Sequence, residues 1–371
     1  MVAKGTSKQM SKKLTILLLT LVVLISLSVG YVLIGLQAYA HYQWNSQANQ
    51  EHCGGQPPVR ICVQAPTAIF SAFYPSYVAN HNNQFVIEYS SSSPVTLLIN
   101  VDIPGFTRVQ TRTVNASLSL QSISFMPPLL DHVLRNFTAE DNTSLHVWVT
   151  DTQNHSYYIN DTPLLLHSRW LMQWVAVNRL MIAAWVTPND PAVADLVAKS
   201  MRYLPSEPAP TPTAMIGYNQ ASRKQVADQV DAIFDALRID YKIQYVQASV
   251  PYGGPADSTE DTQVIKLPSE VLQQHSGMCV ELTVLLASAV ESIGLDAEIV
   301  IIPGHAFLGV AVTPDDRHFQ YWDAVLVNNN VAGTSANVFT DSVYAQNVKQ
   351  HTILDTILID DARKADIDPM V

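Results

Sequence analysis

One uncharged apolar run near the N-terminus limits what this chain can fold into more than any other feature. Residues 14–36, LTILLLTLVVLISLSVGYVLIGL, are 23 residues without a charge, and a helix needs about 20 such residues to span a bilayer. Several lysines precede the run, and no Lys or Arg follows it until Arg60. Because cytoplasmic flanks carry the excess of Lys and Arg, the pattern predicts a single-pass protein of the cell membrane. Its N-terminus is then cytoplasmic, and the bulk of the chain is extracytoplasmic.

A cleaved signal peptide is the alternative interpretation of this run. The sequence AYA at 38–40 is a plausible A-x-A cleavage site. The apolar core of a signal peptide spans about 7–15 residues, however, and the run here is longer. We therefore interpret residues 1–37 as a cytoplasmic stub and a transmembrane anchor that contacts the lipid bilayer through residues 14–36. Under either interpretation, most of the chain lies outside.

Charge and cysteine content then limit the partners and the state of the thiols. The net charge is −11 and the part beyond the apolar run has no basic patch, which argues against nucleic acid as a partner. An oxidising exterior would let Cys53 and Cys62 pair across the short loop GGQPPVRI, and two unpaired thiols are the alternative. Pairing leaves Cys279 as an odd thiol, which in an exported protein is either buried or reactive.

Sequence patterns indicate two segments in the first half of the exported part. Residues 38–65 are rich in Gln, Asn, Gly and Pro, which is typical of a stalk. Residues 66–165 contain short alternating runs such as VTLLINVDI and SLHVWVTD, and these predict a β-sandwich. The same segment holds Asn-x-Ser/Thr sequons, which mark surface loops if the cell attaches glycans. They begin at Asn115, Asn136, Asn142, Asn154 and Asn160.

Residues 170–371 change to helical spacing followed by strands, so the chain as a whole is α+β. Asn189 or Asp190 can cap a helix that has Pro191 in its first turn. The sequence SEPAPTPT breaks the pattern, and helical spacing resumes over 222–239. A further helix and then strands follow, an order typical of helices packed on an antiparallel sheet.

That further helix carries Cys279 in its first turn. Ser276 is a candidate N-cap, which makes Cys279 the third helical residue, and Gly294 suits the position after the helix end. The free N–H groups and the positive end of a helix favour the thiolate. The alternative is a small apolar side chain that fills the core, as cysteines often do.

A predicted hairpin places a histidine beside an aspartate. His305 lies nine residues before Pro314 and Asp323 lies nine after it, so a hairpin centred on Pro314 sets the two directly opposite each other. The thiolate can then attack an acyl carbon, the imidazole can move the proton, and the carboxylate can orient the ring.

The other histidines fit this site less well. His318 points to the opposite strand face, and His275 sits outside the helix. A zinc site built from Cys279, His305, His318 and Asp323 lacks C-x-x-C or H-x-x-x-H spacing. We therefore expect neither a metal nor another cofactor.

The stretch from VIKLPSEVLQQHSGMCVELTVLL to YWDA resembles the transglutaminase-like core of the papain-like cysteine peptidase superfamily. The resemblance covers residues 215–330 and lies in a Gly-x-Cys that opens a helix, a His that begins a strand and an Asp on the next strand. It implies catalytic roles for Cys279, His305 and Asp323 in acyl transfer on an amide of a protein or peptide substrate. The enzyme would be a peptidase or amidase, or a protein crosslinker. Glu281 replaces the Asp that many relatives carry two residues after the Cys.

An active site of this type also needs donors for the oxyanion. The backbone N–H of Cys279 is the obvious donor, with Gln263 or Gln273 as candidates for the second. The alternative function is a non-catalytic transglutaminase-like scaffold that binds or displays a partner at the cell surface.

The anchor can be tested by protease treatment of intact cells. We expect the protease to remove the chain beyond the apolar run and to spare the N-terminus, because only the exported part is accessible. Immunoblots with tags at the two ends measure this. A mature chain that starts at His41 would show instead that the run is a cleaved signal peptide.

Overall fold

The computed structural model describes residues 49–205, 214–247, 262–314 and 318–370. The expected anchor at 14–36 lies outside these residues. Within the described ranges, no helix is long and apolar enough to cross a bilayer. The described chain is a mixed α+β structure with several sheets, which agrees with the α+β class expected from the sequence.

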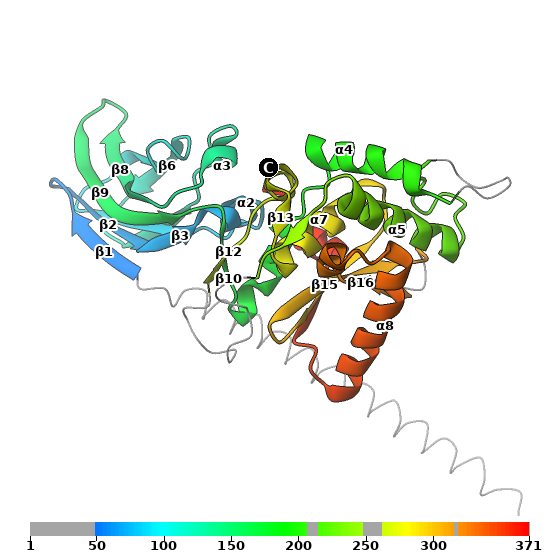
Figure 1. Ribbon diagram of the computed structural model, residues 1–371. Coiled ribbons are helices and arrows are strands. Elements are labelled where there is room, and N and C mark those ends of the chain that lie inside the picture. The colour runs from blue at the N-terminus through cyan, green and yellow to red at the C-terminus, as the bar shows by residue number, and fades with distance from the viewer. Residues whose placement is uncertain (1–48, 206–213, 248–261, 315–317, 371) are drawn as a thin grey trace, which may run out of the picture. The chain divides into compact units, whose positions relative to one another are not determined.

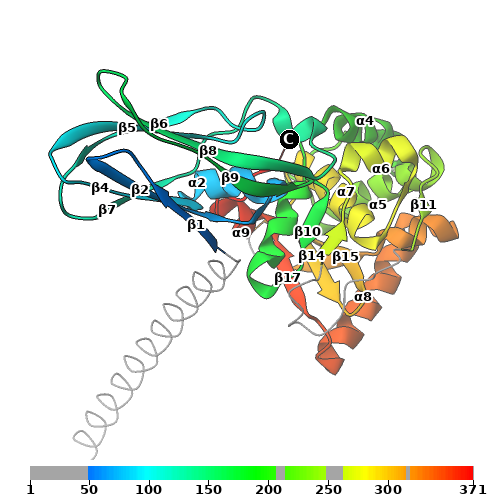
Figure 2. The same ribbon diagram turned by 90° about the vertical axis from the view of Figure 1, so that its left-hand side faces the viewer.

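Two sheets make up the first half of the described chain, and Figure 2 shows them as two layers. The four-stranded sheet has the order β1-β2-β4-β7, with β1 Asn49–Gly54, β2 Val59–Pro66, β4 Phe85–Ser91 and β7 Gln121–Phe125. The five-stranded sheet has the order β3-β9-β8-β5-β6, with β3 Ala68–Phe70, β9 Ser156–His167, β8 Asp141–Asp151, β5 Val95–Asp102 and β6 Gln110–Ala116. The long β8–β9 hairpin curls, which gives this half the form of a half-barrel (Figure 1).

Alternating burial explains why these segments are strands. Phe85, Ile87 and Tyr89 are buried, whereas the residues between them are only partly covered. β5 and β8 follow the same two-residue period, which places one apolar face of each strand toward a core. The short strands predicted in this region are therefore confirmed. The helical pieces between them are η1 Ser71–Phe73, α2 Tyr74–Ala79 and α3 Val133–Asn136.

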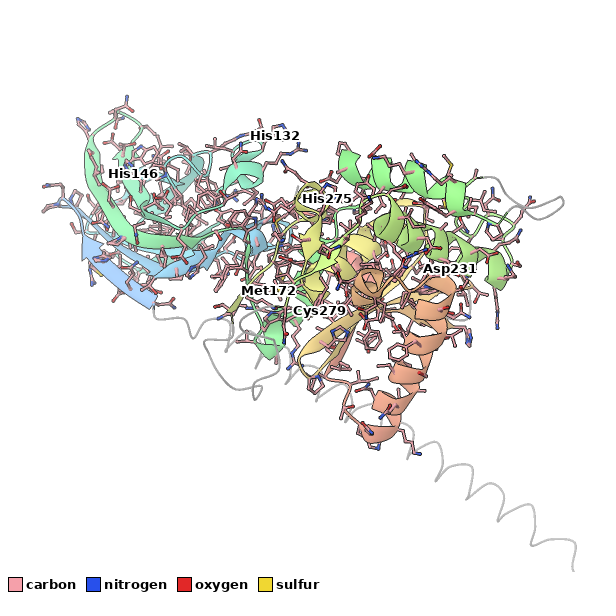
Figure 3. All side chains as sticks on the ribbon, in the orientation of Figure 1. His132, His146, Met172, Asp231, His275 and Cys279 are labelled. Atoms are coloured by element: carbon pink, nitrogen blue, oxygen red, sulfur yellow. A yellow bond between two sulfur atoms is a disulfide. The ribbon has the colours of Figure 1, made fainter. Side chains whose placement is uncertain are left out.

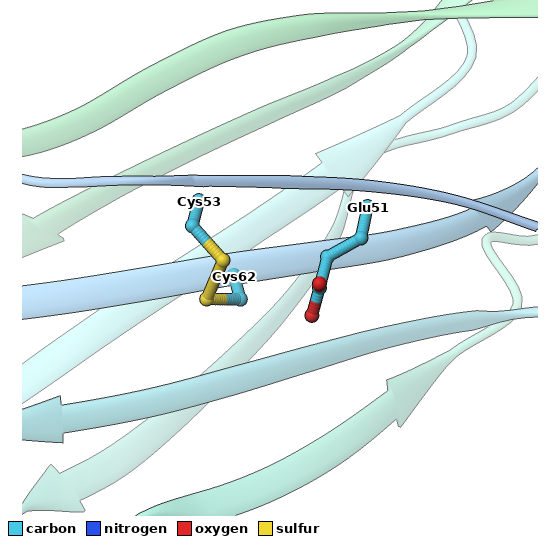
Figure 4. Close-up of side chains that lie close together, drawn as sticks. All are labelled: Glu51, Cys53 and Cys62. Atoms are coloured by element: carbon cyan, nitrogen blue, oxygen red, sulfur yellow. A yellow bond between two sulfur atoms is a disulfide. The ribbon is translucent and has the colours of Figure 1, made fainter.

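The start of the first sheet differs from the expected stalk. Residues 49–66 form β1 and β2, and β2 is largely buried. Gly55, Pro57 and Pro58 of this segment lie in the turn between the two strands, so a composition typical of a stalk here belongs to a hairpin. The turn brings Cys53 and Cys62 together in a disulfide, with Glu51 beside it (Figure 4). The expected pairing of these two cysteines is thus present in the structure.

The second half contains most of the helices. They are η2 Ala176–Trp185, α4 Pro191–Ser200, η3 Met201–Tyr203, α5 Arg223–Ile239, α6 Pro268–Gln274, α7 Cys279–Ser292, η4 Ala324–Asn329, α8 Gly333–Gln350 and α9 Ile359–Lys364. Asp190 caps α4 through a bond from the Ala192 N–H at 2.8 Å, and Ser222 caps α5. The first helix therefore begins after one of its two predicted cap residues, and α5 covers nearly all of the predicted helical range 222–239.

An antiparallel four-stranded sheet supports these helices, with the order β16-β15-β14-β17. Its strands are β14 Ala297–Ile302, β15 His305–Ala311, β16 Phe319–Trp322 and β17 Asp355–Leu358. α7 packs along β14 and β15, and α8 packs on β16. Two small two-stranded pairs, β10 Leu171–Gln173 with β12 Thr262–Val264 and β11 Gln244–Tyr245 with β13 Ser276–Gly277, lie outside this sheet.

α7 is the central helix of this half, because every residue from Val280 to Val290 is buried. Its polar residues are therefore buried along with the apolar stripe that the sequence showed. The Ser288 hydroxyl donates to the Val284 carbonyl at 2.8 Å and accepts from the Thr187 N–H at 2.9 Å. Buried polar groups need such partners, so the position of α7 is specified by hydrogen bonds as well as by packing.

The disulfide predicts the number of free thiols. We expect one thiol per chain in denatured, unreduced protein, because Cys53 and Cys62 are bonded and Cys279 is free. Titration with a chromogenic disulfide in denaturant measures this number. Reduction before denaturation is the control and should give three, and a value of three without reduction would contradict the pairing.

Candidate active site

Cys279 is the first residue of α7 and not the third as expected (Figure 3). Ser276 does not cap the helix, because Ser276 and Gly277 form β13 and pair with β11. This tertiary pairing holds the chain extended up to Met278, which has a φ of −83° and a ψ of 172°. The first N–H groups of a helix have no intrahelical acceptor, so the thiol lies where the helix end is most positive.

The N-cap residue Met278 makes no side-chain hydrogen bond to the helix, and the carboxylate of Glu281 binds the backbone there instead. Its carboxylate accepts from the Met278 N–H at 3.0 Å and from the Lys266 N–H at 2.9 Å. Burial raises the pKa of Glu281, and the hydrogen bonds and the nearby Lys266 ammonium partly offset that rise. The buried carboxylate thereby fixes the backbone immediately before Cys279.

Thr283 ties the start of α7 to the start of β15. Its fully buried hydroxyl lies 2.8 Å from the Cys279 carbonyl oxygen and 3.1 Å from the Ala306 carbonyl oxygen. A single hydroxyl proton is thus shared between the turn that carries the thiol and the residue after His305. No sequence pattern distinguishes this threonine, and our sequence analysis did not single it out.

The imidazole of His305 is bonded to Asp323, although the hairpin register differs from the expected one. The expected register set the two residues directly opposite each other. In the structure Leu308 pairs with Trp322, so the hairpin is centred one residue later and Asp323 is diagonal to His305. A two-residue shift keeps each side chain on its face. The His305 Nε2 and Asp323 Oδ2 atoms therefore still lie 2.7 Å apart.

The Asp323 carboxylate is held in place by the turn that follows β16. Its Oδ1 accepts from the Val325 N–H at 3.2 Å, which caps η4, and its own N–H donates to the buried Thr340 hydroxyl at 2.9 Å. The preceding residue, Trp322, donates its indole N–H to Asp231 of α5 at 2.8 Å. The carboxylate is thus fixed on both sides before it contacts the imidazole.

Cys279 and His305 line the same pocket. Burial alone would lower the pKa of the imidazole, but the hydrogen bond to Asp323 and the neighbouring Cys279 outweigh it and raise the pKa to about 10. The ring is therefore an imidazolium at neutral pH. This pKa exceeds the value of about 6.5 of an unperturbed histidine. The stabilisation of the fold by the charged ring is therefore complete below a pH of about 6.5 and is lost as the pH rises through about 10.

A pocket opens beside the thiol and the imidazole. Its walls include Trp174, Tyr245, Gln247, Gln263, Val280, Ile301 and Ala306. The Trp174 indole donates to the Gln263 Oε1 atom at 2.9 Å, which fixes the amide so that its Nε2 donates on the other side. That amide lies 3.2 Å from the sulfur of Met278, the residue before Cys279. Gln263 is therefore one of the residues of the candidate active site.

The remaining candidates lie elsewhere. Gln273 is an exposed residue of α6 and does not line the pocket. His275 is also exposed and contacts the Tyr241 carbonyl oxygen at 2.7 Å. His318 lines a different pocket together with Asp341 and Tyr344. Within the described ranges, the one cluster with metal-ligand geometry is Glu51 with Cys53 and Cys62, whose sulfurs are already joined to each other.

The structure thus brings Cys279, His305 and Gln263 to one pocket, and Asp323 is hydrogen-bonded to the imidazole of His305. The arrangement can hold a nucleophilic sulfur, a proton carrier and an amide donor around one small group. Comparisons of the chain with protein-family models, with curated proteins and with solved structures found no match.

Thr283→Val tests whether the shared hydroxyl positions the thiol. We expect about tenfold slower alkylation of Cys279 by iodoacetamide at pH 7, because a small misplacement of reacting groups has effects of this order or larger. The lost hydrogen bonds should also lower the free energy of unfolding by about 1–2 kcal/mol. Mass spectrometry of the single free thiol and denaturant unfolding measure the two quantities.

Two variants control for a general loss of stability. Thr283→Ser keeps the hydroxyl and should restore the alkylation rate. Ser288→Ala removes a buried hydroxyl from the same helix, far from the thiol, and should destabilise the protein without changing that rate. Equal alkylation rates in Thr283→Val and the wild type would show that the hydroxyl is only structural.

Proposed function

We propose that this protein is a membrane-anchored, extracytoplasmic thiol enzyme that transfers acyl groups from amides through Cys279, His305 and Asp323. One observation carries the proposal. A half-buried imidazole is bonded to a carboxylate and lines one pocket together with the thiol of a cysteine at a helix N-terminus. An adjacent imidazole and a helix N-terminus are two of the environments that activate a nucleophilic cysteine.

The proposed family is that of transglutaminase-like enzymes, with residues 170–371 as the catalytic domain. The three side chains come in the order of a helix start, a strand start and the turn that follows the next strand, and this order supports the assignment. The two preceding sheets would then be a separate recognition or spacer module in the form of a β-sandwich. The Cys53–Cys62 disulfide supports an oxidising compartment for the whole exported part.

The proposed reaction begins with a thiolate–imidazolium pair. The Cys279 sulfur attacks the amide carbonyl carbon, and a tetrahedral intermediate forms whose oxyanion needs two donors. The Cys279 N–H has no intrahelical acceptor, and the Gln263 amide nitrogen is the second donor in the same pocket. His305 then gives its proton to the leaving amine as the C–N bond breaks, and a thioester remains on Cys279.

The second half of the reaction releases the acyl group. His305, now neutral, takes a proton from water or from an amine, which attacks the thioester carbon. Water gives hydrolysis, and a lysine amine gives a crosslink between proteins. Asp323 keeps the imidazole oriented throughout, because its Oδ2 contacts Nε2 and leaves Nδ1 for the sulfur.

Substitution of the three residues should give graded effects. Cys279→Ala should abolish turnover of an amide substrate and leave the free energy of unfolding within about 1 kcal/mol, because it removes one half-exposed sulfur. Asp323→Asn should keep the fold and slow the reaction by about 10²–10⁴-fold, since the ring loses its orienting charge. Activity of Cys279→Ala equal to the wild type would exclude a thiol enzyme.

The charged imidazole also predicts the pH dependence of thiol reactivity. Cys279 of the wild type should be alkylated at pH 6 at least about tenfold faster than in His305→Ala, because an isolated thiol is almost fully protonated at that pH. Turnover should fall as the pH rises through about 10, where His305 loses its proton. The rate of iodoacetamide modification measures the first effect, and identical rates in both proteins would argue for the non-catalytic scaffold.

A further inference from the structure

The sequons of the N-terminal sheets are a motif that the proposed reaction does not use. All five lie between residues 115 and 162, and no other Asn of the chain begins a sequon. An N-linked glycan is bulky and soluble, so its Asn must lie where a sugar chain can project into water. The exposure of each Asn side chain in the structure divides the five sequons into two groups.

Four of the five asparagines are exposed. Asn115 lies on the edge strand β6 opposite Thr96, while its neighbour Val114 pairs with the buried Leu97. Asn142 lies on β8 in the strand positions that alternate with the buried ones. Asn136 is the last residue of α3, and Asn154 lies in the turn between β8 and β9. Each of these side chains therefore points away from the core.

Asn160 is different, because it lies on the core-facing side of β9. It pairs with Val147, which is fully buried, and the buried Tyr158 and Thr162 share its strand face. Its amide nitrogen donates to the Thr162 hydroxyl at 2.8 Å. A sugar on this nitrogen would have to lie inside the half-barrel, so a chain modified there could not fold as observed.

Exposed apolar side chains lie next to one of the exposed sequons. Leu118 and Leu120, which follow Asn115 in the turn between β6 and β7, are 81% and 59% exposed. A glycan on Asn115 would shield these leucines from other molecules.

We propose that Asn115, Asn136, Asn142 and Asn154 carry N-linked glycans and that Asn160 does not. The donor is a lipid-linked oligosaccharide. The Asn amide nitrogen loses a proton and bonds to the anomeric carbon, while the bond from that carbon to the lipid phosphate oxygen breaks and the lipid phosphate leaves. The inference rests on the proposed extracytoplasmic location and is independent of the thiol chemistry.

The test is glycopeptide mass spectrometry of the full chain isolated from its own cells. Chymotrypsin cleaves after Tyr157 and Tyr158, so it separates Asn154 from Asn160. We expect hexose-containing mass increments on the peptides of the four exposed asparagines and an unmodified Asn160. Sugar on Asn160 of folded protein, or no sugar on any of the four, would overturn the proposal.

Matched variants keep the outcome independent of folding. Ser156→Ala removes the sequon of Asn154 and keeps the Asn, whose φ of 65° suits an asparagine. It should remove one glycan from the intact mass, whereas Asn160→Asp should remove none. A thiol count on the same sample distinguishes failure of the glycan proposal from failure of the proposed extracytoplasmic location. Sugar-free protein with a Cys53–Cys62 bond refutes the glycans alone, and sugar-free protein with three thiols refutes the location as well.

Discussion

The imidazole of His305 has to be held from two sides, and the rest of the second half of the protein is arranged to allow this. Burial disfavours a charged ring, yet the bond to Asp323 and the neighbouring Cys279 raise its pKa to about 10. Three parts of the chain must therefore lie close together. They are the start of α7, the start of β15 and the turn after β16. A displacement of any one of them would leave a buried ring without its partners, which is costly in an apolar surrounding.

Buried polar side chains hold these three segments in register. Glu281 fixes the backbone before the cysteine, Thr283 joins α7 to β15, and Thr340 of α8 holds the backbone of Asp323. None of these side chains reaches the pocket as a reactant. Each is satisfied by backbone groups, which is how polar residues are tolerated in a helix buried on all sides such as α7. The site is thus specified by hydrogen bonds that packing alone could not supply.

Local signals in the sequence predicted the elements well and their junctions less well. Alternation fixed the faces of β15 and β16, so His305 and Asp323 met although the hairpin centre was misplaced by one residue, because the exact turn is not encoded by alternation. The start of α7 was misplaced because β13 pairs with β11, which is distant in sequence. The composition of residues 49–66 did not indicate the strands β1 and β2. The helix α8 was not predicted, because exposed Val338 and Phe339 interrupt its polar face. Thr283 has no signature, since its two acceptors come together only in the fold.

The protonation state of His305 is the central claim, and a direct titration tests it. The measurement is NMR of the protein with ¹⁵N-labelled histidine, with the His305→Gln variant to assign the ring signals. The account predicts that the His305 imidazole stays charged through neutral pH and titrates near 10. Cys279→Ala and Asp323→Asn should each move this pKa downward, because each removes one of the groups that raise it. An imidazole that titrates near 6.5 in the wild type, the value of an unperturbed histidine, would contradict the account.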